Sequence, residues 1–431
     1  MTKITFIRPN LSGLQSKDAM QPLAFAVLAA LTPKDIELEL YDEKVEKIPL
    51  NLNTDFIAMS VETFTAKRAY YLSSIFRKRG IKVLMGGCHP TIMPEEAKEY
   101  CDSIVIGEPE KIWGEIIDDF KKGKLKKTYK DTKPVDITNL IYDKSIFKGK
   151  KYLPVLPIQF SRGCNKDCDF CCVKSILGSG IRYRSIDCII DEIKSCKEKY
   201  FFFVDDNLFT NKNKLIELLE KLIPLKIKWS CQMSIDIGRQ EDLLLLMEKS
   251  GCISVFIGFE SLSIKNLNLM NKYTNINYSD YQNIIKRIKR HNILVYGAFI
   301  LGYDYDSKNV FEEVTNFTIN HKFFLANFNL LMPFPKTRLY DRLKEEKRLI
   351  YDKWWLDNDY RYGNSFFIPK LMTAKELSNG CYKSRLKFNS IFNEIYRAFD
   401  LKSNTNHLKI FLMSNYVSKK EILKKQGIKL G

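Results

Sequence analysis

The sequence lacks a long apolar run. No segment reaches the roughly 18 consecutive apolar residues that a membrane-spanning helix needs. The first ten residues, MTKITFIRPN, show no basic region followed by an apolar stretch, which is the pattern of a secretion signal. We therefore expect a cytoplasmic protein without a transmembrane segment, for which peripheral contact with a membrane surface stays open.

Acidic residues are in deficit. The 51 Asp and Glu residues stand against 69 Lys and Arg residues, and the formal net charge is +18. This excess could serve an anionic partner. However, lysine is spread along the whole chain, and the dense tracts are only KKGKLKK (121–127) and KKEILKK (419–425). We expect no nucleic acid as a partner, because the sequence has neither an RNA-binding motif nor a basic stripe interleaved with aromatic residues.

The sequence also lacks the composition of disordered or fibrous proteins. Hydrophobic residues make up 45%, aromatic residues 13% and charged residues 28%, which is typical of globular proteins. A chain of 431 residues is too long for one comfortable core, and it contains no repeat of 20 to 50 residues. We expect three domains, over residues 1–140, 141–335 and 336–431.

Strands and helices alternate in the first of these domains. The expected strands are 3–9, 36–42, 55–61, 82–87 and 103–110, with helices over 22–33, around 65–80 and from Pro94. A polar linker is expected over about 124–150. Such alternation predicts a doubly wound parallel sheet of the Rossmann type, which binds ligands beyond the carboxyl ends of its strands.

The alternation resumes with a longer period in the second domain. Six strands are expected at 155–161, 200–207, 228–234, 254–260, 294–302 and 323–333. The helices between them are expected at 186–199, 212–222, 240–250, 278–291 and 309–320. Six such units favour a partial βα barrel over a second flat sheet. The pattern becomes mainly helical after about residue 340.

Most of the eleven cysteines stand far apart and are expected to be buried thiols, because the cytosol keeps thiols reduced. The segment CNKDCDFC is different, since it places Cys164, Cys168 and Cys171 in one loop after the first barrel strand. Three closely spaced thiolates suit an iron–sulfur cluster and leave one iron open. A ferredoxin or zinc site would need a further cysteine pair nearby. Cys172 adjoins Cys171 and is expected to pack beside the cluster.

Cys164, Cys168, Phe170 and Cys171 resemble the signature of the radical S-adenosylmethionine (SAM) superfamily. The resemblance implies a [4Fe-4S] cluster whose open iron chelates SAM and whose electron splits it reductively. SAM contacts are implied at Phe170 in this loop and at residues on the following strands. The full set is Phe170, Asp205, Asp206, Asn207, Ser234, Ile257, Gly258, Glu260 and Phe299. The alternative for each strand-end residue is a helix cap or a turn.

The first domain is similar to the cobalamin-binding domain of cobalamin-dependent radical SAM enzymes, and the whole chain to the branch that contains hopanoid methylases. PLAFAVLAALTP, GGCHPTIMPEEA and IVIGEPE carry the first likeness. The cobalamin contacts it implies are Ser60, Thr63, Gly86, Gly87, His89, Gly107 and Glu108. The Asp-x-His-x-x-Gly motif for a histidine below cobalt is absent, so histidine-off binding is expected. His89 then shapes a loop or is a turn residue.

This resemblance implies a methyltransferase acting on an unactivated carbon of a lipid or natural-product intermediate. Its cofactors are the [4Fe-4S] cluster, SAM and cobalamin, and its partners are a small-molecule or lipid substrate and a reducing electron donor such as flavodoxin or ferredoxin. No residue is identified as catalytic. Two alternatives stay open: a cobalamin-free radical SAM enzyme that rearranges, couples or sulfurates carbon, and a nucleic-acid-binding protein, whose binding would be sensitive to salt.

Overall fold

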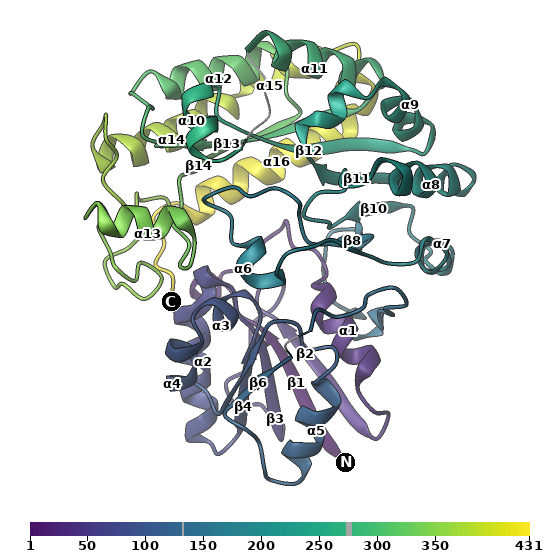
Figure 1. Cartoon of the computed structure of the whole chain (residues 1–431), viewed down its shortest axis with the longest axis vertical. Coiled ribbons are helices and arrows are strands. Elements are labelled where there is room, and N and C mark those ends of the chain that lie inside the picture. The colour runs from purple at the N-terminus through teal and green to yellow at the C-terminus, as the bar shows by residue number, and fades with distance from the viewer. Residues whose placement is uncertain (132, 273–277) are drawn as a thin grey trace.

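The computed structural model describes residues 1–131, 133–272 and 278–431. A parallel sheet near the N-terminus stands below a second, larger α/β unit, and helices from the C-terminal part of the chain border the latter (Figure 1). No helix within these described ranges is long and apolar enough to cross a bilayer. The α/β fold predicted from the sequence is confirmed: a parallel sheet lies at the N-terminus, a second unit of six parallel strands lies where the partial βα barrel was predicted, and the C-terminal part is mainly helical.

The N-terminal sheet is wholly parallel, in the order β2-β1-β3-β4-β5-β6. Its strands are β1 (Thr2–Arg8), β2 (Ile36–Asp42), β3 (Phe56–Ser60), β4 (Lys82–Gly86), β5 (Ser103–Ile106) and β6 (Thr128–Lys130). The last strand lies in the segment that the sequence assigned to a linker. It has three residues at the sheet edge, too few to show a strand period.

Helices cover both faces of this sheet, because successive side chains of a strand point to opposite faces. Ile57 and Met59 of β3 pack in one core, with α2 (Ala66–Lys78). Phe56 and Ala58 pack in the other core, with α1 (Leu23–Leu31) and α5 (Trp113–Lys121). The short helices α3 (Cys88–Ile92) and α4 (Pro94–Glu99) follow β4. Burial on both faces explains why these strands are almost continuously apolar.

The second sheet is also parallel, in the order β14-β13-β12-β11-β10-β7. Its strands are β7 (Leu156–Ile158), β10 (Tyr200–Phe203), β11 (Lys228–Met233), β12 (Cys252–Glu260), β13 (Leu294–Leu301) and β14 (Leu325–Leu330). The intervening helices include α7 (Ile186–Ser195), α8 (Lys212–Leu222), α9 (Glu241–Lys249), α10 (Ile264–Leu269), α11 (Tyr278–Arg290) and α12 (Val310–Asn320). The six strands and the five longer helices lie where the sequence predicted them.

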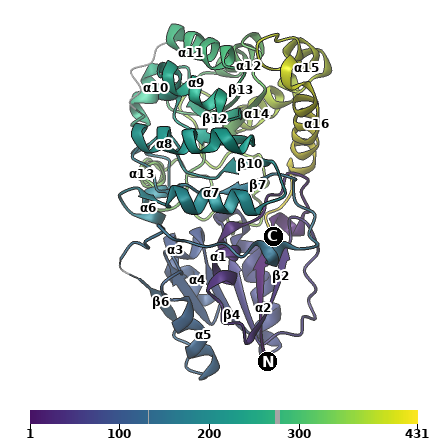
Figure 2. The same cartoon turned by 90° about the vertical axis from the view of Figure 1, so that its right-hand side faces the viewer.

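The C-terminal part is mainly helical and returns to the N-terminal sheet. It comprises α13 (Arg338–Glu345), α14 (Ala374–Phe388), α15 (Ile391–Ala398) and α16 (Leu408–Lys425). Helix α16 runs along one edge of the molecule towards the N-terminal unit (Figure 2). There the Ser16 hydroxyl donates to Glu421 at 2.7 Å, and the Ser12 amide donates to the Leu430 carbonyl at 3.2 Å. The boundaries 1–140, 141–335 and 336–431 stay predictions.

Candidate active site

The three predicted cluster ligands lie on one loop. This loop follows β8 (Ser161–Arg162), which pairs with β9 (Arg182–Tyr183), and ends at α6 (Val173–Leu177). It begins at Gly163, whose φ is +102° and where a Cβ would fall 2.4 Å from the Gly180 carbonyl oxygen. Only glycine fits a positive φ and so close a backbone approach. The chain can therefore turn sharply from β8 into the cysteine loop.

The cysteine loop brings near one another the three thiols that a cubane cluster would need. Cys164, Cys168 and Cys171 lie close enough to influence one another electrostatically. Yet nowhere in the described part of the chain do three His, Cys, Asp or Glu side chains converge enough to hold one metal ion. In a cubane each thiolate binds a different iron, so the sulfurs surround the cluster instead of meeting at a point. Burial raises the pKa of Cys168 and Cys171 to about 11, so iron must displace a proton from each thiol.

A buried carboxylate fixes the start of this loop. Asp205 follows β10 and is 2% exposed. It accepts hydrogen bonds from the Phe160 amide at 3.1 Å, from the Ser161 hydroxyl at 2.5 Å and from the Ser161 amide. Burial raises the pKa of Asp205 to about 6, although these donors oppose the shift. Both carboxylate oxygens are engaged by the chain itself, and the predicted contact of Asp205 with SAM stays a prediction.

Replacing Asp205 with asparagine should weaken the cysteine loop. The amide can accept through one oxygen only, and its NH₂ group would face backbone N–H groups. We expect the free energy of unfolding to fall by about 2 kcal/mol, as for other buried donors left unpaired, and the iron content after reconstitution to fall with it. Chemical denaturation and iron assay measure both. Ser161→Ala is the matched control, because it removes one donor and keeps both backbone bonds; an equal loss in the two variants would contradict this role.

A second buried carboxylate fixes the middle of the loop. Asp169 accepts a hydrogen bond from the Tyr303 hydroxyl. Its backbone is held on both sides, since its amide donates to the Met270 carbonyl and its carbonyl accepts from the Leu339 amide, each at 3.0 Å. The loop is thus tied to the segments after α10, β13 and β14, and its shape does not depend on the cluster alone.

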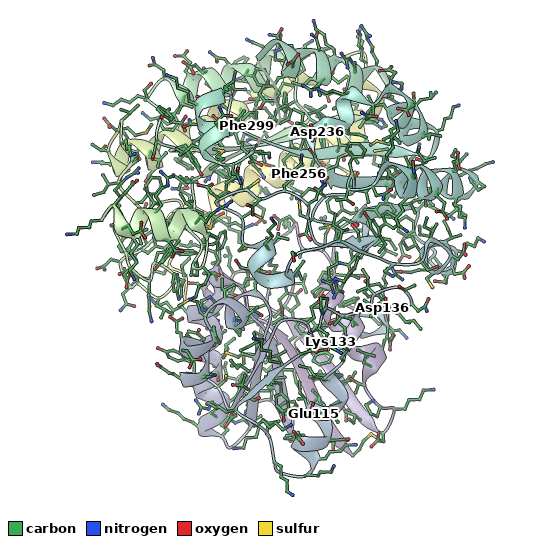
Figure 3. The ribbon with its side chains drawn as sticks, in the orientation of Figure 1. Glu115, Lys133, Asp136, Asp236, Phe256 and Phe299 are labelled. Carbon is green, nitrogen blue, oxygen red and sulfur yellow. The ribbon has the colours of Figure 1, made fainter. Side chains whose placement is uncertain are left out.

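The structure gathers several predicted SAM contacts around this loop. Asp206 accepts from the Gly163 amide at 3.0 Å, and burial raises its pKa. Asn207 accepts from the Ser234 amide at 2.8 Å. The Ser234 hydroxyl donates to Asp236 at 2.6 Å, and Asp236 (labelled in Figure 3) pairs at 3.0 Å with Lys166, which belongs to the cysteine loop. Sequence analysis missed the Lys166–Asp236 pair because the two residues are 70 positions apart.

Gly258 and Glu260 lie on the same side of the site. Glu260 has a φ of +61° and pairs with Lys272, which also donates to the Gly258 carbonyl at 2.7 Å. Lys272 and Glu260 are near enough to Cys168 to affect its pKa. A Cβ on Gly258 would lie 2.1 Å from the Glu260 carboxylate, so a larger residue there would displace the Glu260 side chain. Phe170 is partly buried against the core.

Two predicted SAM contacts pack away from the loop. Phe299 is fully buried and stacks on Phe259 at 5.3 Å, beside Phe317 of α12. Ile257 is also fully buried and belongs to the same core as Phe259. Both side chains fill the layer between the sheet and its helices, and nothing in their surroundings supports contact with SAM. Figure 3 labels Phe299 beside the upper helices.

A cavity of about 290 Å³ lies between the N-terminal sheet and helix α6, which follows the cysteine loop. Its walls come from the carboxyl ends of β3, β4 and β5, from α1 and from α6. Five of the predicted cobalamin contacts line it, namely Ser60, Gly86, Gly87, Gly107 and Glu108. Three of these are glycines, so the cavity meets bare backbone there, as close approach of a large planar group requires. The other walls are largely apolar.

An ion-pair network joins this cavity to the cysteine loop. Arg162 adjoins Gly163 and donates to Glu108 at 2.5 Å and to Glu110 at 2.7 Å. Arg182 donates to the same Glu108 at 2.6 Å. These pairs hold the pKa of Glu108 below its ordinary value against the opposing effect of burial. Glu108, a predicted cobalamin contact, is therefore paired with Arg162, the residue that precedes the cysteine loop. No local pattern in the sequence indicates this pair.

His89 and Thr63 do not line this cavity. The His89 ring is fully buried, with Nε2 at 3.1 Å from both the Tyr70 hydroxyl and the Glu96 carboxylate, and Nδ1 at 3.4 Å from the Thr63 hydroxyl. Since the carboxylate can only accept, Nε2 carries the proton. His89 therefore joins α3 to its neighbours, and a contact of either side chain with cobalamin has no support from this geometry.

Comparison with known proteins adds to this geometry. A family model described as "Radical SAM superfamily" matches residues 158–318. Bacteriochlorophyllide d C-12(1)-methyltransferase of Chlorobaculum tepidum is 31% identical over 83% of this chain and 80% of its own length. Hopanoid C-2 methylase of Rhodopseudomonas palustris is 24% identical over 77% of this chain and 66% of its own length. The structure of TsrM from Kitasatospora setae, with cobalamin and a [4Fe-4S] cluster bound, has a TM-score of 0.64 at 14% identity, covering 80% of this chain and 78% of that one.

Proposed function

Because the chain belongs to the radical SAM superfamily, in the branch of cobalamin-binding methyltransferases, we propose that it methylates an unactivated carbon of a lipid or natural-product intermediate. The observation that carries the proposal is the direct link between the cysteine loop and the glycine-lined cavity through Arg162 and Glu108. A transfer between two cofactors and one substrate needs both sites to be held in one geometry.

Residues of the barrel would hold the cluster and SAM. Cys164, Cys168 and Cys171 would ligate three irons and leave the fourth to SAM. Asp206 is hydrogen-bonded to the first residue of the loop, and Ser234 is linked to the loop through Asp236 and Lys166. Both Asp206 and Ser234 would orient SAM beside the loop. Asp205 and Asp169 act at a distance, since they fix the backbone of the loop. When bound, the cluster, SAM and cobalamin supply the electron that splits SAM and the methyl group that is transferred.

The N-terminal cavity fits part of a cobalamin. Gly86, Gly87 and Gly107 offer bare backbone, and the apolar side chains of α1 and β5 would exclude water from a bound ring or nucleotide tail. None of the four histidines lines this cavity, which supports binding without a histidine below cobalt. Its position against α6 would place a bound corrin next to the cysteine loop.

The substrate is proposed only as a class. By their names, the relatives described above methylate a bacteriochlorophyllide and a hopanoid, and they align with 83% and 77% of this chain. A reducing donor such as flavodoxin or ferredoxin would supply the electron.

Anaerobic reconstitution tests the proposal. The purified chain, with iron, sulfide and hydroxocobalamin supplied, should bind about one corrin per chain and cleave SAM to 5'-deoxyadenosine under reduction. The visible spectrum reports the cluster and the corrin, and chromatography reports the nucleoside. Cleavage without any bound corrin would overturn the cobalamin-dependent reaction and favour a cobalamin-free radical enzyme.

A variant at the cavity separates the two sites. Gly86→Leu should lower corrin binding at least about tenfold, because the added side chain occupies the cavity, while cluster content stays unchanged. Its backbone has no positive φ, and a Cβ would meet only Val105 at 3.6 Å, so the substitution can be accommodated. Gly114→Leu is the matched control, since Gly114 on α5 faces open space. Equal corrin binding by both variants would argue against this cavity.

A further inference from the structure

Helix α15 is packed with its polar side inward. Arg397 is fully buried and donates to the carbonyls of Phe323, Phe324 and Phe388 and to Asn415 of α16, at 2.8 to 3.2 Å. Burial lowers the pKa of Arg397 to about 9. Apolar side chains of the same helix and the following turn are exposed instead. They are Ile391, Phe392, Ile395, Tyr396, Phe399 and Leu401, of which Phe392 is 83% exposed and Leu401 79%.

Helix α16 repeats this inversion beside α15. Its buried residues include Asn415 and Glu421 together with Phe411, which packs on the amino ends of β12, β13 and β14. Its exposed residues include Leu408, Leu412, Met413 and Tyr416. The two helices contact each other and form one outer edge of the molecule (Figure 2). We call the exposed apolar residues of 391–416 the α15/α16 face. So large an exposed apolar set on neighbouring helices is unusual for a surface in contact with water alone.

The exposed charges of the chain segment that carries the α15/α16 face have one sign. Within residues 390–431 the exposed charged side chains are Lys402, Lys409, Lys419, Lys420, Lys424 and Lys429. The three acidic residues of this segment are not exposed; Asp400 and Glu421 are buried and paired with Lys289 and Lys425. Lys322 and Lys420 lie over the rings of Tyr396 and Tyr416, so cations and aromatic rings alternate on this surface.

We propose that the α15/α16 face docks on an anionic lipid bilayer. An apolar stripe rimmed by lysines is the composition of helices that lie in the plane of a membrane interface, with the apolar side chains in the acyl boundary and the lysines among the headgroups. A second copy of the chain would bring two lysine-rich rims together, so like charges oppose self-association through this face. The proposal is independent of the methyl transfer, because it concerns the opposite end of the strands from the cysteine loop.

Vesicle sedimentation tests this docking. The full chain, anaerobically reconstituted, should sediment with vesicles of phosphatidylcholine containing about 30% phosphatidylglycerol, and at least about tenfold less with phosphatidylcholine alone. Binding should weaken strongly in 0.5 M salt, since exposed charges are then screened. Failure to sediment with the anionic vesicles would overturn the proposal.

Three variants locate the surface. The triple variant Phe392→Ser, Phe399→Ser, Leu401→Ser should lose at least about tenfold in vesicle affinity, and Lys402→Gln, Lys409→Gln, Lys419→Gln should lose the preference for anionic lipid. Ile141→Ser, Ile264→Ser, Leu371→Ser is the matched control, because these residues are 72%, 52% and 54% exposed elsewhere on the surface. Circular dichroism confirms that each variant is folded. Equal vesicle binding by the Phe392/Phe399/Leu401 variant and the control variant would contradict the proposal. A wild-type dimer that is disrupted only by the Phe392/Phe399/Leu401 variant would also contradict it, because the face would then bind a second copy of the chain.

Discussion

Replacing Cys168 with alanine is expected to reduce SAM cleavage to below about 1% of wild type and to prevent stable cluster assembly. The reason is that each of the three predicted ligands would bind a different iron, and Cys172, the fourth thiol of the loop, adjoins Cys171 and cannot take the place of a missing ligand. Cys164→Ala and Cys171→Ala should give the same result. Iron and sulfide content, the visible spectrum and 5'-deoxyadenosine formation measure it under anaerobic conditions.

The control for this experiment is the neighbouring cysteine. Cys172→Ala removes the thiol of the residue that follows Cys171 in the chain. Burial raises the pKa of the Cys172 thiol to about 11, as it does for Cys171. It leaves the three predicted ligands unchanged, so cluster content and SAM cleavage should stay near the wild-type level. Loss of the cluster in Cys172→Ala, or cleavage that survives in the triple variant of the other three cysteines, would refute the assignment.

Replacing Glu96 with alanine is expected to lower the free energy of unfolding by about 4 kcal/mol, the scale for a broken buried charge network. One carboxylate oxygen of Glu96 accepts from Tyr70 at 3.0 Å, from His89 at 3.1 Å and from Trp355 at 2.9 Å, and the other pairs with Lys353 at 3.1 Å. Alanine would leave the Tyr70, His89 and Trp355 donors buried without this acceptor, whereas the half-exposed Lys353 can turn to water. Chemical denaturation measures the loss, and Glu95→Ala, an exposed neighbour, should show none.

This network also predicts a pH dependence. Burial raises the pKa of Glu96, but hydrogen bonds from His89, Trp355 and Lys353 outweigh it and lower the pKa to about 2 from an ordinary value of 4.5. A depressed pKa stabilises the fold above the unfolded value and ceases to do so as the pH falls through the folded one. The difference in stability between wild type and Glu96→Ala should therefore be full at pH 6 to 7 and shrink from about pH 4.5 towards pH 2. A constant difference over this range would contradict the ionised state of Glu96.

Local patterns predicted the cysteine loop and the order of the strands. The three cysteines of CNKDCDFC lie within eight consecutive residues, so their spacing alone predicts that they share one loop. Runs such as YFFFVDDN predict a strand and the polar residues at its carboxyl end. The ion pairs and hydrogen bonds between distant parts of the sequence could not be predicted. Arg162 and Glu108 are 54 positions apart, and Glu96 and Trp355 are 259 apart. Only the fold brings such residues together.

The direction of a side chain was the least predictable property of the strands. Parallel strands are apolar on both faces, so the sequence GAFILG does not show which side Phe299 faces. The structure places it in the aromatic layer under α12. The segment GGCHPT favours a loop-shaping or turn role for His89, yet α3 begins at Cys88 and the His89 ring is buried in the interior. A helix of five residues gives too little periodicity to reveal this turn.

The return of the C-terminal segment to the N-terminal sheet bears on how the protein folds during synthesis. The N-terminal sheet is made before the segment around Leu430, so the Ser12 amide finds its acceptor only when Leu430 has been made. The bonds of Ser16 and Lys17 to Glu421 likewise join positions more than 400 residues apart. Contacts of such sequence separation form late and slow the final step of folding. The N-terminal sheet must therefore persist without these bonds while the residues in between are made, and it gains them when the segment from Glu421 to Leu430 has been synthesised.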